Sequence, residues 1–197
     1  AAGAAAAQSY PNKPVKLVVP FTAGSATDIL ARTVGQKLTE MWGQSVVVDN
    51  RPGAGGTIGT AIVAKSPPDG YTLLLHTSAL ASAGPLYKSL PFDPIKDFAP
   101  VTNVVHTQMI VSGSLKSTAT TLPELIAEAK AKPGTLNYAS SGLGSSLHLF
   151  AEIFKNSAGV DIVHIPYRGD APMITAMIAG DVQMAFLPQA TGQAAIQ

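Results

Sequence analysis

Short runs of β-branched residues alternate along this chain with segments of helical periodicity. The first pair is a predicted strand at 16–19 and a predicted helix at 26–41, in which Leu30, Val34 and Leu38 form one apolar stripe. Strands separated by helices pair in parallel, because the chain crosses back over the sheet before it forms the next strand. The alternation therefore predicts an α/β fold.

The alternation runs twice along the chain. The first series continues with strands at 46–48 and 72–76 around a helix at 57–65. The next stretch, 79–100, holds four prolines and is predicted to connect the two series without contributing a core element. The second series is predicted to comprise strands at 104–111, 136–139, 162–165 and 182–187. One helix of this series is predicted to begin at the capping box Thr121-Leu-Pro-Glu124, and two others are predicted to span 145–157 and 171–179. Two such series predict two doubly wound lobes, each with a mainly parallel sheet and with ligands beyond the carboxyl ends of its strands.

Three parts of the chain are expected from this pattern. Residues 1–9 form an alanine-rich leader, 10–103 the first lobe and 104–197 the second. The leader contains Ala5-Ala6-Ala7, the small-x-small pattern that ends an export signal, so it is interpreted as a signal-peptide remnant. A disordered or engineered leader is the alternative.

Charge and cysteine content narrow the classes of function. With 13 Lys and Arg against 12 Asp and Glu, the net charge of +1 provides no field that would hold a nucleic acid. The chain has no cysteine, which excludes disulfides, thiolate metal sites and a thiol nucleophile and is compatible with both cytosol and periplasm. Its apolar runs are far shorter than the ~20 residues of a membrane helix. We expect no metal and no cofactor.

Three junctions between a strand and the next helix carry the candidate binding groups. The first, 20–28, turns through Gly24 into a helix whose first amides have no partner within the helix. Those amides and the positive end of the helix dipole suit a carboxylate or a phosphate. Alternatively, Ser25 or Thr27 only caps the helix and Asp28 only complements its dipole.

The second junction, 137–148, brings four serines and two glycines into one turn. Such a turn offers both backbone and hydroxyl donors to an anion. Use of these serines by a hydrolase is the alternative. The nucleophile elbow, however, requires Gly-x-Ser-x-Gly, whereas Ser145 is followed by Ser146 and Leu147.

The third junction, 165–172, contains two side chains that a pocket could use. Arg168 either neutralises an anion or pairs with Asp170 at the surface, and the residues alone leave both uses open. Tyr167 is interpreted as a wall of the pocket, with ordinary core packing as the alternative.

The glycine-rich segment 50–59 follows a predicted strand and opens a helix, as nucleotide-binding loops do. Ile58 nevertheless stands where the dinucleotide fingerprint requires glycine or a similar residue, and no Gly-Lys-Ser/Thr ending makes the segment a P-loop. We therefore interpret it as a turn that packs closely on its strand. A nucleotide-dependent enzyme that uses this loop is the alternative.

Several of these motifs together resemble one family. They are Pro20-Phe21 with Gly24 and Asp28, and the segments 50–56, 64–74, 90–98, 137–142, 164–169 and 171–172. In this order they resemble the Bug-type solute-binding receptors of tripartite tricarboxylate transporters, over about residues 10 to 187. The resemblance implies a periplasmic, monomeric receptor of the two-lobed periplasmic-binding-protein architecture (type II-like). Such a receptor closes on a small organic carboxylate, delivers it to a membrane permease and catalyses no reaction.

The resemblance also implies ligand-binding positions. They are Phe21, Thr22, Gly24, Ser25, Asp28 and Ser78 in the first lobe, and Ser140, Ser141, Gly142, Ser145, Tyr167 and Gly169 in the second. Ser25 departs from the family, which usually has a second glycine there. Residues 187–189 lack the polar residue that usually follows this strand, which favours plain carboxylic acids. Family chains are longer, so the second lobe is expected to be incomplete at Gln197.

Overall fold

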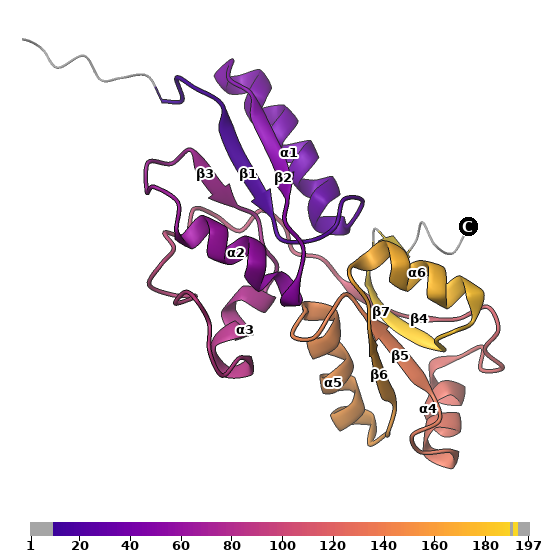
Figure 1. Ribbon diagram of the computed structural model, residues 1–197. Coiled ribbons are helices and arrows are strands. Elements are labelled where there is room, and N and C mark those ends of the chain that lie inside the picture. The colour runs from indigo at the N-terminus through magenta and orange to yellow at the C-terminus, as the bar shows by residue number, and fades with distance from the viewer. Residues whose placement is uncertain (1–9, 190, 193–197) are drawn as a thin grey trace, which may run out of the picture.

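The computed structural model describes residues 10–189 and 191–192, which form two α/β lobes, each with its own sheet (Figure 1). Lobe 1 contains a three-stranded sheet in the order β2 (Val46–Asn50), β1 (Val15–Val19) and β3 (Thr72–Leu74). Both strand pairs are parallel, and β1 pairs with β2 in the register that places Val15 opposite Val46. The mixed α/β fold class is therefore the one predicted.

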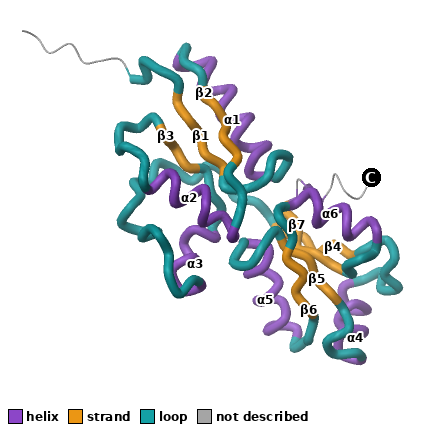
Figure 2. Tube along the Cα trace, viewed as in Figure 1, coloured by secondary structure: helices purple, strands orange, loops and turns teal. Residues whose placement is uncertain are grey.

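Lobe 2 contains a four-stranded sheet in the order β4 (Met109–Gly113), β7 (Met184–Pro188), β5 (Asn137–Ser140) and β6 (Val163–Pro166), as Figure 2 also shows. The pairs β5–β6 and β5–β7 are parallel, whereas β4 runs antiparallel to β7. The sheet is thus mainly parallel, with one antiparallel strand at its edge.

The five predicted helices follow the strands in the predicted order, and the structure adds η1 and α3. In chain order the helices are α1 (Ala26–Trp42), the short 3-10 helix η1 (Ala54–Gly56), α2 (Thr57–Ala64), α3 (Ala79–Leu86), α4 (Leu122–Ala131), α5 (Ser146–Ala158) and α6 (Asp170–Ala179). Local chemistry sets their ends. Gly43 ends α1 in the left-handed region at φ 66°, and α4 begins with the complete capping box of Thr121 and Glu124. None of the helices in the described ranges is both long and apolar enough to cross a membrane.

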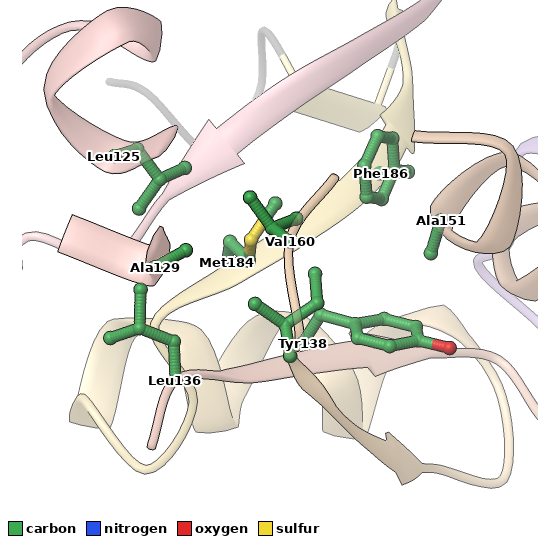
Figure 3. Packing of buried hydrophobic residues seen from close by; sticks show 9 residues of the cluster. Leu125, Ala129, Leu136, Tyr138, Ala151, Val160, Met184 and Phe186 are labelled. Carbon is green, nitrogen blue, oxygen red and sulfur yellow. The ribbon is translucent and has the colours of Figure 1, made fainter. Parts of the chain in front are cut away.

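Strand β7 is buried on both faces and organises the core of lobe 2. Met184 and Phe186 face a cluster that also includes Tyr138 of β5 (Figure 3). Ala185 and Leu187 face a second cluster on the other side of the sheet. Side chains alternate along a strand, so this continuous apolar run requires a covered sheet on both sides.

The prediction for 79–100 is wrong at its beginning, because Ala79–Leu86 forms α3. Pro85 stands next to the last residue of this helix, where its ring removes only one late hydrogen bond. Ala79 and Ala83 of this helix are buried. The proline content therefore hid a short helix.

The predicted strand at 104–111 begins later than expected. Residues 101–108 are exposed and have no regular structure, and β4 begins at Met109, opposite Pro188 of β7. β-Branched residues favour an extended backbone, but a strand also needs a neighbour to pair with. The predicted leader, 1–9, and the chain end at Gln197 lie outside the described residues.

Candidate functional site

A cavity of about 210 Å³ lies between the two lobes. Its wall is made by residues 20–22 and 52–56, which follow β1 and β2, and by 141–143 and 166–169, which lie at the ends of β5 and β6. This is the carboxyl edge of both sheets, the edge at which open parallel sheets bind ligands.

The sequence-predicted residues divide into two groups around this cavity. Phe21, Thr22, Ser141, Gly142, Tyr167 and Gly169 line it. The others, which do not line it, are Gly24, Ser25, Asp28, Ser78, Ser140 and Ser145. Ser78 is exposed and directly precedes α3. Ligand contact by these residues stays a prediction.

Asp28 holds the β1–α1 loop from behind. Its carboxylate accepts hydrogen bonds from the Gly24 amide at 2.9 Å, Asn50 Nδ2 at 2.9 Å and Arg32 Nε at 3.0 Å. Asn50 Nδ2 also donates to the carbonyl of Phe21, which ties the cavity wall to β2. Burial raises the pKa of Asp28, but the Arg32, Gly24 and Asn50 donors outweigh it and leave the pKa below its ordinary value.

Two predicted serines cap the helices that begin at the site. Ser25 Oγ accepts the amide of Asp28 at 3.2 Å at the start of α1, and Ser145 Oγ accepts the amide of His148 at 3.3 Å at the start of α5. Both residues are almost completely buried. Their hydroxyls therefore hold the helix starts in place, as the capping alternative for Ser25 states.

Ser140 supports the β5–α5 loop through a second buried network. Its hydroxyl oxygen accepts the Gly142 amide at 3.1 Å and lies 2.6 Å from His164 Nε2. The His164 ring stacks between the rings of His148 and Tyr138, at centroid distances of 4.3 and 4.8 Å. Burial, reinforced by the neighbouring His148, lowers the pKa of His164 to about 4. The imidazole is therefore neutral at neutral pH.

Gly169 brings the two lobes into direct contact. It has φ 114°, and a Cβ atom at this position would overlap Thr22 Oγ1 of lobe 1. A larger residue there would require the Thr22 side chain to move. The Thr22 hydroxyl is itself buried and has no hydrogen-bond partner among the described residues. It is thus a polar group of the cavity wall whose hydrogen-bonding capacity is not used by the described residues.

Asp170 and Arg168 occupy opposite environments after β6. Asp170 is buried, which raises the pKa of its carboxyl, while the Ala26 amide and the Ser141 hydroxyl donate to it and lower the pKa in part. Arg168 is exposed, lines the cavity and makes no ion pair within 4.0 Å with another described residue.

The glycine-rich loop after β2 has two roles, of which only one was predicted. A Cβ atom at Gly59 would lie 2.7 Å from the carbonyl of Arg51, in line with a turn that packs closely on its strand. Gly53 and Gly55, however, line the cavity. The place of this loop in the sequence indicates the second role, because the loop follows a strand of the same parallel sheet and such loops lie at the edge that binds ligands.

Metal chemistry finds no support in residues 10–189 and 191–192. They contain no group of three or more His, Cys, Asp or Glu side chains that could hold an ion. The site instead presents loop amides, the Thr22 hydroxyl and the Arg168 guanidinium, a set of donors that complements an anion.

The family model described as "Tripartite tricarboxylate transporter family receptor" matches residues 30–197. Among curated proteins, the chain is 41% identical over 178 residues to protein BugT of Bordetella pertussis, covering 89% of this chain and 55% of BugT. The chain spans between about half and three fifths of the lengths of the curated relatives that head the comparison.

Solved structures give the same picture. The Rhodopseudomonas palustris protein Rpa4515 with adipate is 39% identical, with a TM-score of 0.88 over 91% of this chain and 60% of that one. The periplasmic binding protein BugD is 35% identical, with a TM-score of 0.86 over 91% and 60%. MatC of the same Rhodopseudomonas species, with bound malate, is 29% identical, with a TM-score of 0.81 over 91% and 61%.

Proposed function

The chain belongs to the receptor family of the tripartite tricarboxylate transporters, and from this premise we propose that it binds a small organic carboxylate between its two lobes. The family is one of solute-binding receptors and not of enzymes. The geometry likewise leaves the hydrolase alternative without a nucleophile at Ser140 or Ser145, because both are fully buried behind the cavity wall.

The observation that carries this proposal is the donor set of the cavity. The amides of Gly55 and Gly169 donate no hydrogen bond to another group in the described part of the chain, and both residues line the cavity. Arg168 adds a positive charge that no described carboxylate neutralises. A carboxylate supplies oxygen acceptors for all three groups.

The strength of these contacts is sufficient for capture. Each hydrogen bond to a charged group contributes ~1.5 to 3 kcal/mol, and micromolar affinity requires ~8 kcal/mol. A few such bonds reach this value after the loss of ligand freedom. The structural neighbours hold adipate and malate, which supports an acyclic dicarboxylate as the ligand class of this cavity.

The wider role follows from the family and is part of the proposal. We place the receptor in the periplasm as a monomer that delivers its ligand to the permease of a tripartite transporter. Its first lobe spans 10–103 and its second 104–197, after the leader 1–9. The twelve residues named from the sequence remain the proposed ligand-binding set, with Ser25, Asp28, Ser140 and Ser145 acting from behind the wall.

A thermal-shift screen of mono-, di- and tricarboxylates tests the proposal directly. Binding to the folded state raises the melting temperature by mass action, by the equivalent of about 2.7 kcal/mol at 100 times Kd. We expect malate or adipate to raise it. The proposal fails if none of the acids does so and calorimetry shows no heat of binding.

Substitution of Arg168 tests whether the carboxylate binds at this cavity. Arg168→Gln removes a charged donor from the cavity wall and should weaken malate affinity at least about tenfold. Arg51→Gln is the matched control, since Arg51 is similarly exposed, pairs with Asp49 and lies outside the wall. Equal affinities for the two variants in calorimetry would argue against binding at this cavity.

A further inference from the structure

A hydrogen bond from Tyr87 joins the lobes at one end of the cavity. The Tyr87 hydroxyl lies 2.9 Å from the carbonyl oxygen of Ala54 in lobe 1 and 2.9 Å from that of Leu143 in lobe 2. A phenol has one hydrogen, so the two carbonyls share it as acceptors. We call Tyr87, the loop 53–56 and the turn 142–144 the clasp.

The clasp requires glycine on both sides. A Cβ atom at Gly55 would overlap the Leu143 carbonyl and lie 2.6 Å from the Tyr87 hydroxyl. A Cβ atom at Gly144 would lie 2.9 Å from the same hydroxyl. Both glycines also have positive φ, at 63° and 77°, which other residues rarely adopt. The two backbones can therefore approach the phenol only where no side chain intervenes.

Tyr87 acts on the cavity from outside it. Ala54, Gly55 and Leu143 line the cavity, whereas Tyr87 does not. The phenol is partly buried, and burial raises the pKa of its hydroxyl, so the donor is retained through neutral pH. The bond to Ala54 lies within lobe 1, whereas the bond to the Leu143 carbonyl is available only while lobe 2 is close enough to reach the phenol.

We propose that Tyr87 is a positioning residue that holds the two lobes together over an occupied cavity and thereby sets how long the ligand stays. This inference rests on the proposed function, since it assumes a carboxylate in the cavity. It assigns a role to the glycine-rich loop that neither packing on the strand nor nucleotide binding explains. Release of the ligand then requires the shared hydrogen bond to break.

The kinetic test measures the binding and release of malate and adipate by this chain. Tyr87→Phe keeps the ring and removes the hydroxyl, so the dissociation rate should rise about 3- to 10-fold, as the loss of one hydrogen bond predicts, with little change in the association rate. Tyr71→Phe is the matched control, because the Tyr71 hydroxyl bonds only Asn12 within lobe 1. Its rates should equal those of the unmodified chain.

A second measurement does not depend on any ligand. The chain has no cysteine, so spin labels can be placed on Met41→Cys in lobe 1 and Leu115→Cys in lobe 2, two strongly exposed positions. The distance distribution between the labels should become broader and longer in Tyr87→Phe and more so in Gly55→Ala. Gly55→Ala is interpreted only if its circular dichroism matches that of the unmodified chain.

These two measurements separate the inference from the proposed function. If the unmodified chain binds neither acid, the proposed function fails and the label distances alone decide the clasp. If it binds, and Tyr87→Phe leaves both the dissociation rate and the distances unchanged, the clasp is overturned. Faster dissociation together with wider distances, absent in Tyr71→Phe, supports it.

Discussion

The loops after β1 and β5 both contribute to the cavity wall, but they have different supports. In lobe 1 the turn after β1 is held by the ionised Asp28 and its donors from Arg32, Gly24 and Asn50. In lobe 2 the turn after β5 is held by Ser140 and a stack of neutral aromatic rings. One binding geometry is thus maintained by charge on one side and by neutral hydrogen bonding on the other. The two sides should therefore respond differently to substitution and to pH.

Removal of the charged support should have the largest effect. Asp28→Ala leaves the Gly24 amide and the Arg32 and Asn50 side chains without their common acceptor in a buried site, which should lower the free energy of unfolding by about 3 kcal/mol. Urea denaturation measures this loss of unfolding free energy. Glu40→Ala, which breaks an exposed pair with Lys37, is the control and should cost under about 0.5 kcal/mol. Similar losses for both variants would contradict the role of Asp28.

Removal of the neutral support should cost less. Ser140→Ala leaves the Gly142 amide and His164 Nε2 without their shared partner, and we expect a loss of about 2 kcal/mol. Ser140→Thr retains the hydroxyl and should recover part of it if the extra methyl group fits. An unchanged urea midpoint in Ser140→Ala would show that the Ser140 hydroxyl does not stabilise lobe 2, which would contradict the comparison of the two supports.

The contributions of the two supports to stability should be lost over different ranges of pH. The pKa of His164 is lowered to about 4, so its contribution to stability is complete above the ordinary value of 6.5 and is lost as the pH falls toward 4. Asp28, whose pKa lies below 3.8, keeps its contribution throughout that range. After allowance for the exposed part of the ring, we expect His164 to account for about 1 kcal/mol at pH 5.

The measurement is the difference in unfolding free energy between pH 7 and pH 5 for the unmodified chain and for His164→Asn. His76 also has a pKa lowered by burial to about 4, and its contribution cancels in this comparison because both proteins retain it. The same pH dependence in both proteins would show that the lobe 2 support does not titrate in this range.

The smallest effect should come from the outer edge of the charged support. The Arg32 side chain is 57% exposed, so its ion pair with Asp28 is screened by solvent on one side. Arg32→Gln should lower the free energy of unfolding only slightly, and added salt should reduce the difference from the unmodified chain further. A loss as large as that of Asp28→Ala would mean that the guanidinium, and not the amide donors, stabilises the carboxylate.

Much of the fold could be predicted from the sequence because its signals are local. The stripe of Leu30, Val34 and Leu38 and the capping box at Thr121 act within a few residues, and the helices containing or following them were placed correctly. Helix α3 was missed because its support comes from burial of Ala79 and Ala83, which no neighbouring residue reveals. The late start of β4 likewise depends on a partner strand far along the chain.

The site was less predictable for the same reason. The three junctions were identified from their helix starts, and residues from each of them line the cavity. The resemblance places Asp28 and Ser140 among the ligand-binding positions; in the structure both accept hydrogen bonds from the chain's own amides and do not line the cavity, so their role toward a ligand stays a prediction. The lobe contact at Tyr87 joins residues 33 and 56 positions away, a relation that periodicity and spacing do not express.

Much of the cavity wall is main chain, contributed by Gly53, Gly55, Gly142 and Gly169. A substitution changes the side chain and leaves the peptide group in place, and three of these glycines leave little or no room for a side chain. Mutation can therefore alter the selectivity of the receptor mainly through the few side chains that interrupt the wall, such as Leu143, Tyr167 and Arg168. Under the proposed function, recognition of the acid group would be inherited unchanged, while preference for the rest of the ligand would diverge among descendants.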